Sequence, residues 1–156
     1  RDLVPARDAA GLRALRADGS LVYERAYVEQ SVGQVRAEAQ RYARTTRGSL
    51  DRFEWDAERA ARLELLWRDM RDRRVRVIAY LPPYHPAVWD DLSRDARSRS
   101  ALEATAAFLA SLAGRLGVRF ENFSDPASVP CAEAEFLDGT HARDTCLGRI
   151  VDRLLR

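Results

Sequence analysis

Apolar residues recur at helical spacing in the first third of the chain. Steps of four and three residues predict one helix there, with an apolar face formed by Val28, Val32, Val35, Ala39 and Tyr42. Leu12 and Leu15 indicate a shorter helix before it, ending at the Asp18-Gly19 turn dipeptide. The polar segment 45–48, which contains Thr, Arg and Gly, is expected to be a loop. The first third of the chain is therefore predicted to be mainly helical.

Four more helices are predicted further along the chain. Asp56 is expected to cap the first of them, whose apolar face consists of Ala60, Leu63, Trp67 and Met70. Pro86 is expected to begin the second, because proline is tolerated in a first helical turn. The third ends at Gly117, where glycine favours a helix end, and its apolar face consists of Leu102, Ala106, Leu109, Ala113 and Leu116. A closing helix is marked by Leu147, Ile150, Val151 and Leu154.

Two apolar runs that follow helices predict strands. Val75–Leu81 is stopped by Pro82-Pro83, and Val118–Phe123 comes directly after Gly117. Alternating helices and strands imply right-handed crossovers and a parallel sheet covered by helices, hence a helix-rich α/β fold. Two strands are too few for a stable sheet. Further strands are therefore expected in the first 55 residues or in sequence outside the chain.

Composition limits the size and class of the protein. With 156 residues, the chain is expected to form one domain, residues 1–156. Its 26 basic residues are all arginine and are interleaved with 24 acidic ones, for a net charge of +2, so nucleic-acid binding is not expected. No stretch approaches the ~20 apolar residues of a membrane span, and we expect none in this chain.

The two cysteines leave two interpretations open. Cys131 and Cys146 lack the short paired spacing of a zinc site. In an exported protein they would close a disulfide across the segment 138–141, whereas otherwise they would be free, partly buried thiols.

The segment Asp138-Gly139-Thr140-His141 contains candidate acid/base residues. An Asp three residues before a His can accept a hydrogen bond from imidazole Nδ1 and hold the tautomer in which Nε2 takes a proton from a nucleophile. The simpler alternative is that Asp-Gly forms a turn and Thr140 caps the last helix. The position of the segment, after a strand and loop and before an amphipathic helix, favours the acid/base interpretation.

Tyr84 and His85 are candidate substrate-binding residues. They follow the Val75–Leu81 strand, and ligands of doubly wound folds bind at the carboxyl ends of strands. Alternatively, the segment is a rigid, proline-fixed connection whose Tyr84 and His85 pack or face solvent. Another hypothesis takes His85, Asp138 and His141 as a zinc site, although sequence spacing does not fix their geometry. No metal or cofactor is expected.

The order of these elements resembles the second half of the SGNH/GDSL hydrolase superfamily. The similarity covers roughly residues 55–156, and segments 80–86 and 136–141 resemble those of envelope-associated SGNH-like proteins. The resemblance implies an incomplete flavodoxin-like parallel sheet with flanking helices, forming the C-terminal portion of a larger domain. It also implies a Ser-His-Asp mechanism, in which Asp138 orients and His141 is the general base. An acylated small molecule or a carbohydrate would be the substrate, and the location would be extracytoplasmic.

The chain departs from that family pattern in its nucleophile. The family serine lies in a Gly-Asp-Ser block after a strand, whereas Asp18-Gly19-Ser20 has these residue types in another order with no strand-like run before it. Ser20 is therefore not expected to be the nucleophile, and Asn122, inside the second predicted strand, is not expected to line an oxyanion hole. The serine is expected in upstream sequence. The alternative function is a non-catalytic SGNH-like binding or scaffold module.

Overall fold

The computed structural model describes residues 3–4, 13–16 and 21–156, and the statements below concern these residues. Its elements, in chain order, are β1 (Leu3–Val4), β2 (Arg13–Arg16), β3 (Leu21–Tyr23), α1 (Arg25–Val28), α2 (Val32–Leu50), α3 (Ala57–Asp72), β4 (Ile78–Leu81), α4 (Pro86–Arg94), α5 (Ala96–Leu116), β5 (Arg119–Asn122), the 3₁₀ helix η1 (Glu133–Glu135) and α6 (Asp144–Leu155).

The strands form two separate sheets. β4 and β5 pair in parallel, with Ile78 opposite Arg119 and Leu81 opposite Asn122. The N-terminal strands form an antiparallel sheet in the order β1-β2-β3. The described part of the chain is thus a helix-rich α/β structure with a two-stranded parallel sheet. The extra strands of the first 55 residues do exist, but they do not extend that sheet.

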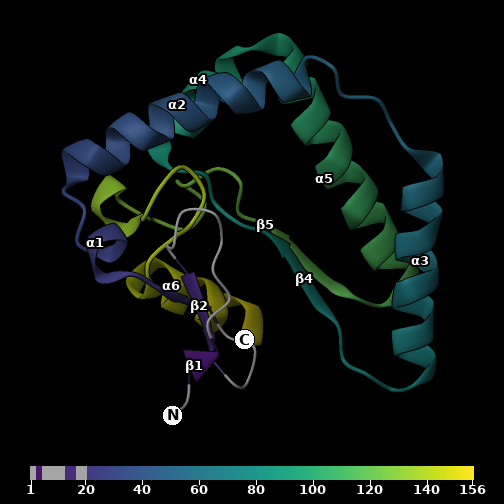
Figure 1. Ribbon diagram of the computed structural model, residues 1–156. Helices are drawn as coiled ribbons and strands as arrows, with labels where there is room; N and C mark the ends of the chain where they lie inside the picture. The colour runs from purple at the N-terminus through teal and green to yellow at the C-terminus, as the bar shows by residue number, and fades with distance from the viewer. Residues whose placement is uncertain (1–2, 5–12, 17–20) are drawn as a thin grey trace.

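Both faces of the β4–β5 sheet are covered by helices. Successive strand residues point to opposite faces, so Ala79 packs with Trp67 and Leu112 of α3 and α5, whereas Ile78 packs with the cluster that contains Ile150 of α6. In Figure 1, α3 and α5 run side by side on one side of the strands, and α6 lies on the other. α2 spans the top of the molecule and packs on α4 through Ala39, Ala43, Val88 and Leu92.

Three predictions in the first third of the chain were wrong. Leu15 lies in β2 rather than in a helix, while Leu12 and the Asp18-Gly19 dipeptide lie outside the described residues. The helix predicted from Val28 to Tyr42 is interrupted before Ser31, whose side chain caps α2 by accepting from the backbone N–H of Gln34. The segment 45–48 is helical, because α2 continues to Leu50.

The later helices agree with prediction. The Asp56 side chain caps α3 by accepting from the backbone N–H of Arg59, and Pro86 is the first residue of α4. Gly117 ends α5 with φ 67°, a left-handed conformation that glycine adopts without steric cost. The two predicted strands are shorter than their apolar runs. Thr140 does not cap the last helix, because α6 begins at Asp144.

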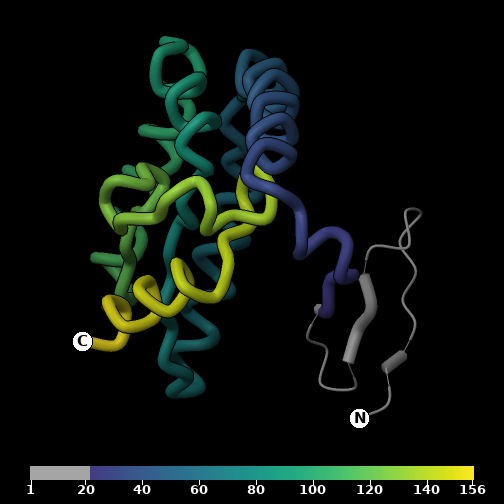
Figure 2. The backbone as a smooth tube through the Cα atoms, turned by 90° about the vertical axis from the view of Figure 1, so that its left-hand side faces the viewer, coloured from purple at the N-terminus to yellow at the C-terminus, as the bar shows by residue number. Residues whose placement is uncertain are grey.

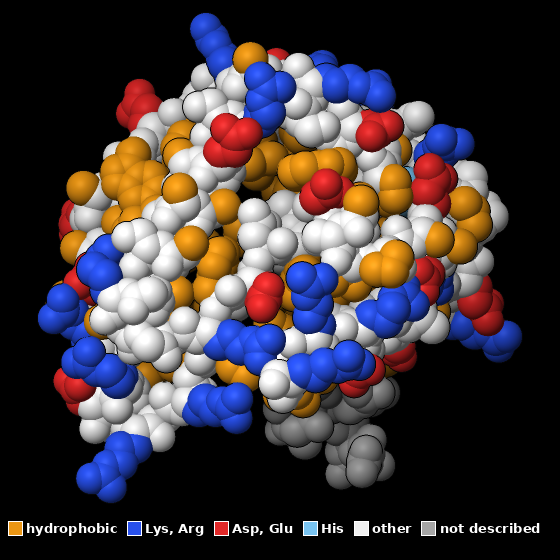
Figure 3. Space-filling model, turned by 180° about the vertical axis from the view of Figure 1, so that it is seen from behind, with side chains coloured by type: hydrophobic (Ala, Val, Ile, Leu, Met, Phe, Trp, Pro, Cys, Tyr) orange, Lys and Arg blue, Asp and Glu red, His pale blue; other side chains and the backbone are white. Residues whose placement is uncertain are grey.

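The described surface has apolar and charged regions. Figure 2 shows the segment around α1 standing to one side of the helical body. Figure 3, from behind, shows several hydrophobic patches, a large one at the upper left of the view, with Arg and acidic side chains between and around them. Among the described residues, no helix has the length and apolar character needed to cross a membrane.

Candidate functional site

The segment from Asp138 to His141 is a tight turn between two short extended stretches. Phe136 forms an antiparallel bridge with Ala142, and the Leu137 N–H donates to the His141 carbonyl at 2.7 Å. Asp138 Oδ1 accepts from the backbone N–H groups of Thr140 and His141, both at 2.8 Å. This is the local bonding for which Asp is favoured in turns, and it fixes the carboxylate next to the imidazole.

The Asp138 and His141 side chains are hydrogen-bonded. Asp138 Oδ2 lies 2.7 Å from His141 Nδ1, and the exposed fraction is 24% for the Asp138 side chain and 45% for that of His141. With the carboxylate ionised, Nδ1 carries the proton in this bond, so Nε2 of the neutral ring is the basic nitrogen. The geometry therefore fits an Asp that orients a His base.

Tyr27 is a member of this site that the sequence analysis missed. Its hydroxyl donates to Asp138 Oδ2 at 2.5 Å, across 111 positions of sequence. The Tyr23 ring lies 5.2 Å from the Tyr27 ring and 6.0 Å from the His141 ring, between centroids. Nothing in the sequence marks Tyr27, because no spacing rule relates α1 to a turn so far along the chain.

The pKa of Asp138 is well below its ordinary value. Partial burial raises this pKa, but hydrogen bonds from the His141 and Tyr27 side chains and from the Thr140 and His141 backbone outweigh burial and lower it. The carboxylate is therefore ionised throughout the neutral pH range, as an orienting group for an imidazole must be.

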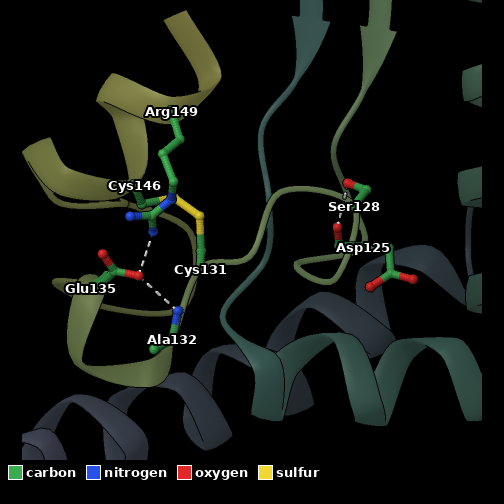
Figure 4. The surroundings of a disulfide bond; sticks show 7 residues. All are labelled: Asp125, Ser128, Cys131, Ala132, Glu135, Cys146 and Arg149. Atoms are coloured by element: carbon green, nitrogen blue, oxygen red, sulfur yellow. Dashed lines mark hydrogen bonds and ion pairs between the residues drawn. A yellow bond between two sulfur atoms is a disulfide. The ribbon is translucent and has the colours of Figure 1, made fainter. Parts of the chain in front are cut away.

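A disulfide braces the loop that carries the site. Cys131 and Cys146 are bonded, with Cα atoms 5.4 Å apart, which decides between the two interpretations of these cysteines (Figure 4). Beside it, Arg149 of α6 donates to Glu135 at 2.5 Å, and the same carboxylate accepts from the Ala132 N–H at 2.9 Å. The Arg149 hydrogen bond is the main reason that the pKa of Glu135 falls to about 2. η1 and α6 are thus joined on either side of the turn.

His85 lies completely buried beneath this turn. Its Nδ1 accepts from the Ala87 N–H at 3.1 Å and caps α4, and its ring meets the Phe136 ring edge-on at 5.4 Å. The His85 backbone N–H donates to the Gly139 carbonyl at 3.0 Å. Burial lowers the pKa of His85, although the charges of Glu133 and Asp138 act in the opposite direction. His85 thus connects the loop after β4 to the loop that carries Asp138.

Tyr84 lines a cavity at the carboxyl end of the parallel strands. The cavity has a volume of about 330 Å³ and is bordered by Tyr42, Leu81, Pro82, Pro83, Tyr84, Leu102, Thr105, Ser124 and Thr140. Burial raises the pKa of Tyr84, so its hydroxyl is protonated at neutral pH. Since Thr140 also borders the cavity, the cavity reaches the turn that holds His141.

Gly139 is required by the close approach of α2. A Cβ at this position would lie 2.8 Å from Cγ and Cδ1 of Tyr42 and 3.0 Å from its Cβ. These distances are shorter than real Cβ contacts, and the atoms belong to the inflexible base of the ring. The glycine therefore lets Tyr42 pack against the turn.

Two candidate residues and the zinc hypothesis remain from the sequence analysis. Asn122 ends β5, and its Oδ1 accepts from the Ser124 N–H at 3.0 Å. Ser20 lies outside the described residues. The zinc hypothesis for His85, Asp138 and His141 was wrong: within the described parts of the chain, no group of three or more His, Cys, Asp or Glu residues could hold a metal ion.

No protein-family model, curated protein or solved structure matches this chain. The chemistry of the site is therefore inferred from its own geometry.

Proposed function

We propose that this chain carries the acid/base half of a Ser-His-Asp ester hydrolase or O-acyltransferase of the SGNH type. The observation that supports it best is the 2.7 Å bond between Asp138 Oδ2 and His141 Nδ1, in a turn where the carboxylate accepts from four donors. The nucleophilic serine comes from sequence outside these 156 residues. There, further strands extend β4–β5 into a flavodoxin-like sheet.

Each residue has a distinct role in this mechanism. His141 Nε2 takes the proton of the serine hydroxyl as the serine oxygen attacks the acyl carbonyl, and Asp138 stabilises the imidazolium that forms. The imidazolium then protonates the departing oxygen, leaving an acyl-serine. In the second half of the reaction, His141 deprotonates water or a sugar hydroxyl as it attacks the acyl-serine. The imidazolium then gives this proton to the departing serine oxygen, which regenerates the serine hydroxyl and the neutral base.

The substrate would lie at the carboxyl ends of the parallel strands. Tyr84 and Thr140 border the cavity at this edge, and its mainly apolar lining suits an acyl group. Of the two predicted substrate-binding residues, Tyr84 therefore remains the stronger prediction. Because His85 is completely buried beneath the turn, its role in the proposal is to support the two loops rather than to contact the substrate.

A fluorophosphonate probe, which labels activated serines, tests the proposal on the full-length protein. We expect labelling of the wild type, a loss of at least 100-fold in the labelling rate for His141→Ala, and no change for Glu58→Gln on the exposed surface of α3. A Ser20→Ala variant is included as well. Loss of labelling in that variant would show that the nucleophile lies within this chain and contradict its assignment to other sequence.

The alternative function is a non-catalytic SGNH-like binding module. One observation favours it: Asp138 Oδ1 accepts from the backbone N–H groups of Thr140 and His141, so the carboxylate also has the purely structural role of holding the turn. Absence of labelling in the folded full-length protein would support this alternative and exclude the enzyme.

A further inference from the structure

The short helix α1 is held against the Asp138–His141 turn by polar contacts. None of its residues is fully buried. Tyr27 donates to Asp138 Oδ2 at 2.5 Å, and Arg143 Nη1 donates to the Val28 carbonyl at 2.7 Å. Arg143 Nε also donates to the Phe136 carbonyl at 3.0 Å, which ties the same guanidinium to the turn. The Arg143 contacts therefore connect α1 to the turn beside the bond between Tyr27 and Asp138.

We propose that Tyr27 is a positioning residue of the site. Its hydroxyl fixes the orientation of the Asp138 carboxylate and reduces the electrostatic stabilisation that this carboxylate gives to the protonated His141 ring. This inference rests on the proposed function and deepens it. Oδ1 is held by two backbone N–H groups, while Oδ2 is shared between Tyr27 and His141. With two donors on each oxygen, the carboxylate cannot rotate without breaking several bonds. The residue acts on the base through Asp138.

The electrostatic effect of Tyr27 has a definite sign. A phenol that donates to Oδ2 stabilises the carboxylate and withdraws part of the negative charge that would otherwise face His141. The same bond contributes to the low pKa of Asp138. Without the hydroxyl, more charge on Oδ2 faces the imidazole, so the protonated ring is stabilised and His141 titrates at higher pH.

Other groups also face this pair. Tyr23 of β3 packs its ring near that of His141, and Arg143, just before α6, bonds the backbone on either side. His85 lies beneath the Asp138–His141 turn. The charges of Asp138, Glu133 and Arg36 all influence the pKa of His85. These groups are the same in the wild type and in a Tyr27→Phe variant. A difference between the two proteins therefore reports the Tyr27 hydroxyl.

NMR titration of the histidine ring signals tests the inference. The chain has two histidines, and buried His85 serves as an internal reference for an intact fold. In Tyr27→Phe we expect the midpoint of the His141 titration to rise by about 0.5 pH unit, with His85 signals at wild-type positions. Tyr80→Phe makes the same chemical change on β4 and should leave the His141 midpoint unaltered.

A second variant separates the hydroxyl from the anchoring of α1. Arg143→Lys keeps the positive charge near His141 but cannot donate to the Val28 and Phe136 carbonyls at the same time, so it weakens the other link to α1 and leaves the Tyr27–Asp138 bond. Its His141 midpoint should therefore stay within about 0.2 pH unit of wild type. An unchanged midpoint in Tyr27→Phe, or an equal rise in Arg143→Lys, would overturn the proposal. Because the titration needs no nucleophile, its outcome is independent of the fluorophosphonate result. A failure of the proposed function is thereby distinguished from a failure of this inference.

Discussion

The Asp138 carboxylate shows how a few residues define the site. Its bond to His141 could be predicted, because a separation of three residues places an Asp and a His within one turn. Tyr27 could not be predicted, since its bond to Asp138 depends on how α1 packs 111 positions away. Gly139 could be predicted only in part. The sequence indicates a turn at this position, but it does not show that Tyr42 lies too close for a residue with a Cβ.

Replacing Gly139 by alanine is predicted to destabilise the protein. The new Cβ would meet the base of the Tyr42 ring at 2.8 Å, and relieving such overpacking costs about 1–3 kcal/mol. Denaturant unfolding measures this loss, and it should be smaller in a Tyr42→Ala background. Gly114→Ala is the matched control, because nothing lies within 4 Å of the added Cβ and α5 should gain about 0.5–1 kcal/mol. Equal effects of the two substitutions would contradict this account of Gly139.

Helices were predicted better than strands because their periodicity extends over more residues. α3 and α5 each repeat an apolar face over several turns, and their ends carry recognisable residues in Asp56 and Gly117. The segment 13–16 is too short for a helical period to be distinguished from a strand, and it was misassigned. α2 runs through a polar segment predicted to be a loop, because its Ala39 and Ala43 pack closely on α4.

The disulfide is predicted to stabilise the unit formed by η1, the Asp138–His141 turn and α6. A loop of this length corresponds to about 3 kcal/mol of unfolding free energy through restriction of the unfolded chain. The Cys131→Ala/Cys146→Ala variant should lose roughly that amount, as measured by denaturant unfolding. Reductant should destabilise the wild type similarly and leave the double variant unaffected. An effect of reductant on the double variant would point to a cause other than this bond.

At the scale of the whole molecule, the described residues form two separate sheets. β4 and β5 have helices on both faces, as expected of parallel strands. Within the described residues, each of the two strands pairs with the other along one edge. The loops after both strands meet below the Asp138–His141 turn, where Tyr84 N–H donates to the Ser124 carbonyl and His85 N–H to the Gly139 carbonyl. The site therefore depends on contacts among several distant segments.

The buried His85 is predicted to make the stability of the whole molecule depend on pH. Its folded pKa is lowered by burial from an ordinary 6.5, so the unfolded chain binds a proton more readily. This contribution is fully present above pH 6.5 and is lost as the pH falls towards the folded pKa. Unfolding free energies measured between pH 7.5 and 5 should therefore decrease.

His85→Asn provides the comparison. Asparagine retains an acceptor to cap α4 but does not titrate, so the decrease between pH 7.5 and 5 should become smaller. The variant should also be about 2 kcal/mol less stable than wild type at pH 7.5, because the ring that packs on Phe136 is lost. An equally steep pH dependence in both proteins would show that the effect does not come from His85.

The sequence by itself determined the helix-rich α/β character, the starts of α3 and α4, the end of α5 and the Asp-His pair, because these depend on spacing and capping residues over a few turns of chain. Only the tertiary structure decided the disulfide, the Tyr27 contact, the burial of His85 and the separation of the two sheets. Each of these depends on the packing of segments distant in sequence. Local periodicity and propensity carry no information about such packing, since the same local pattern is compatible with many arrangements.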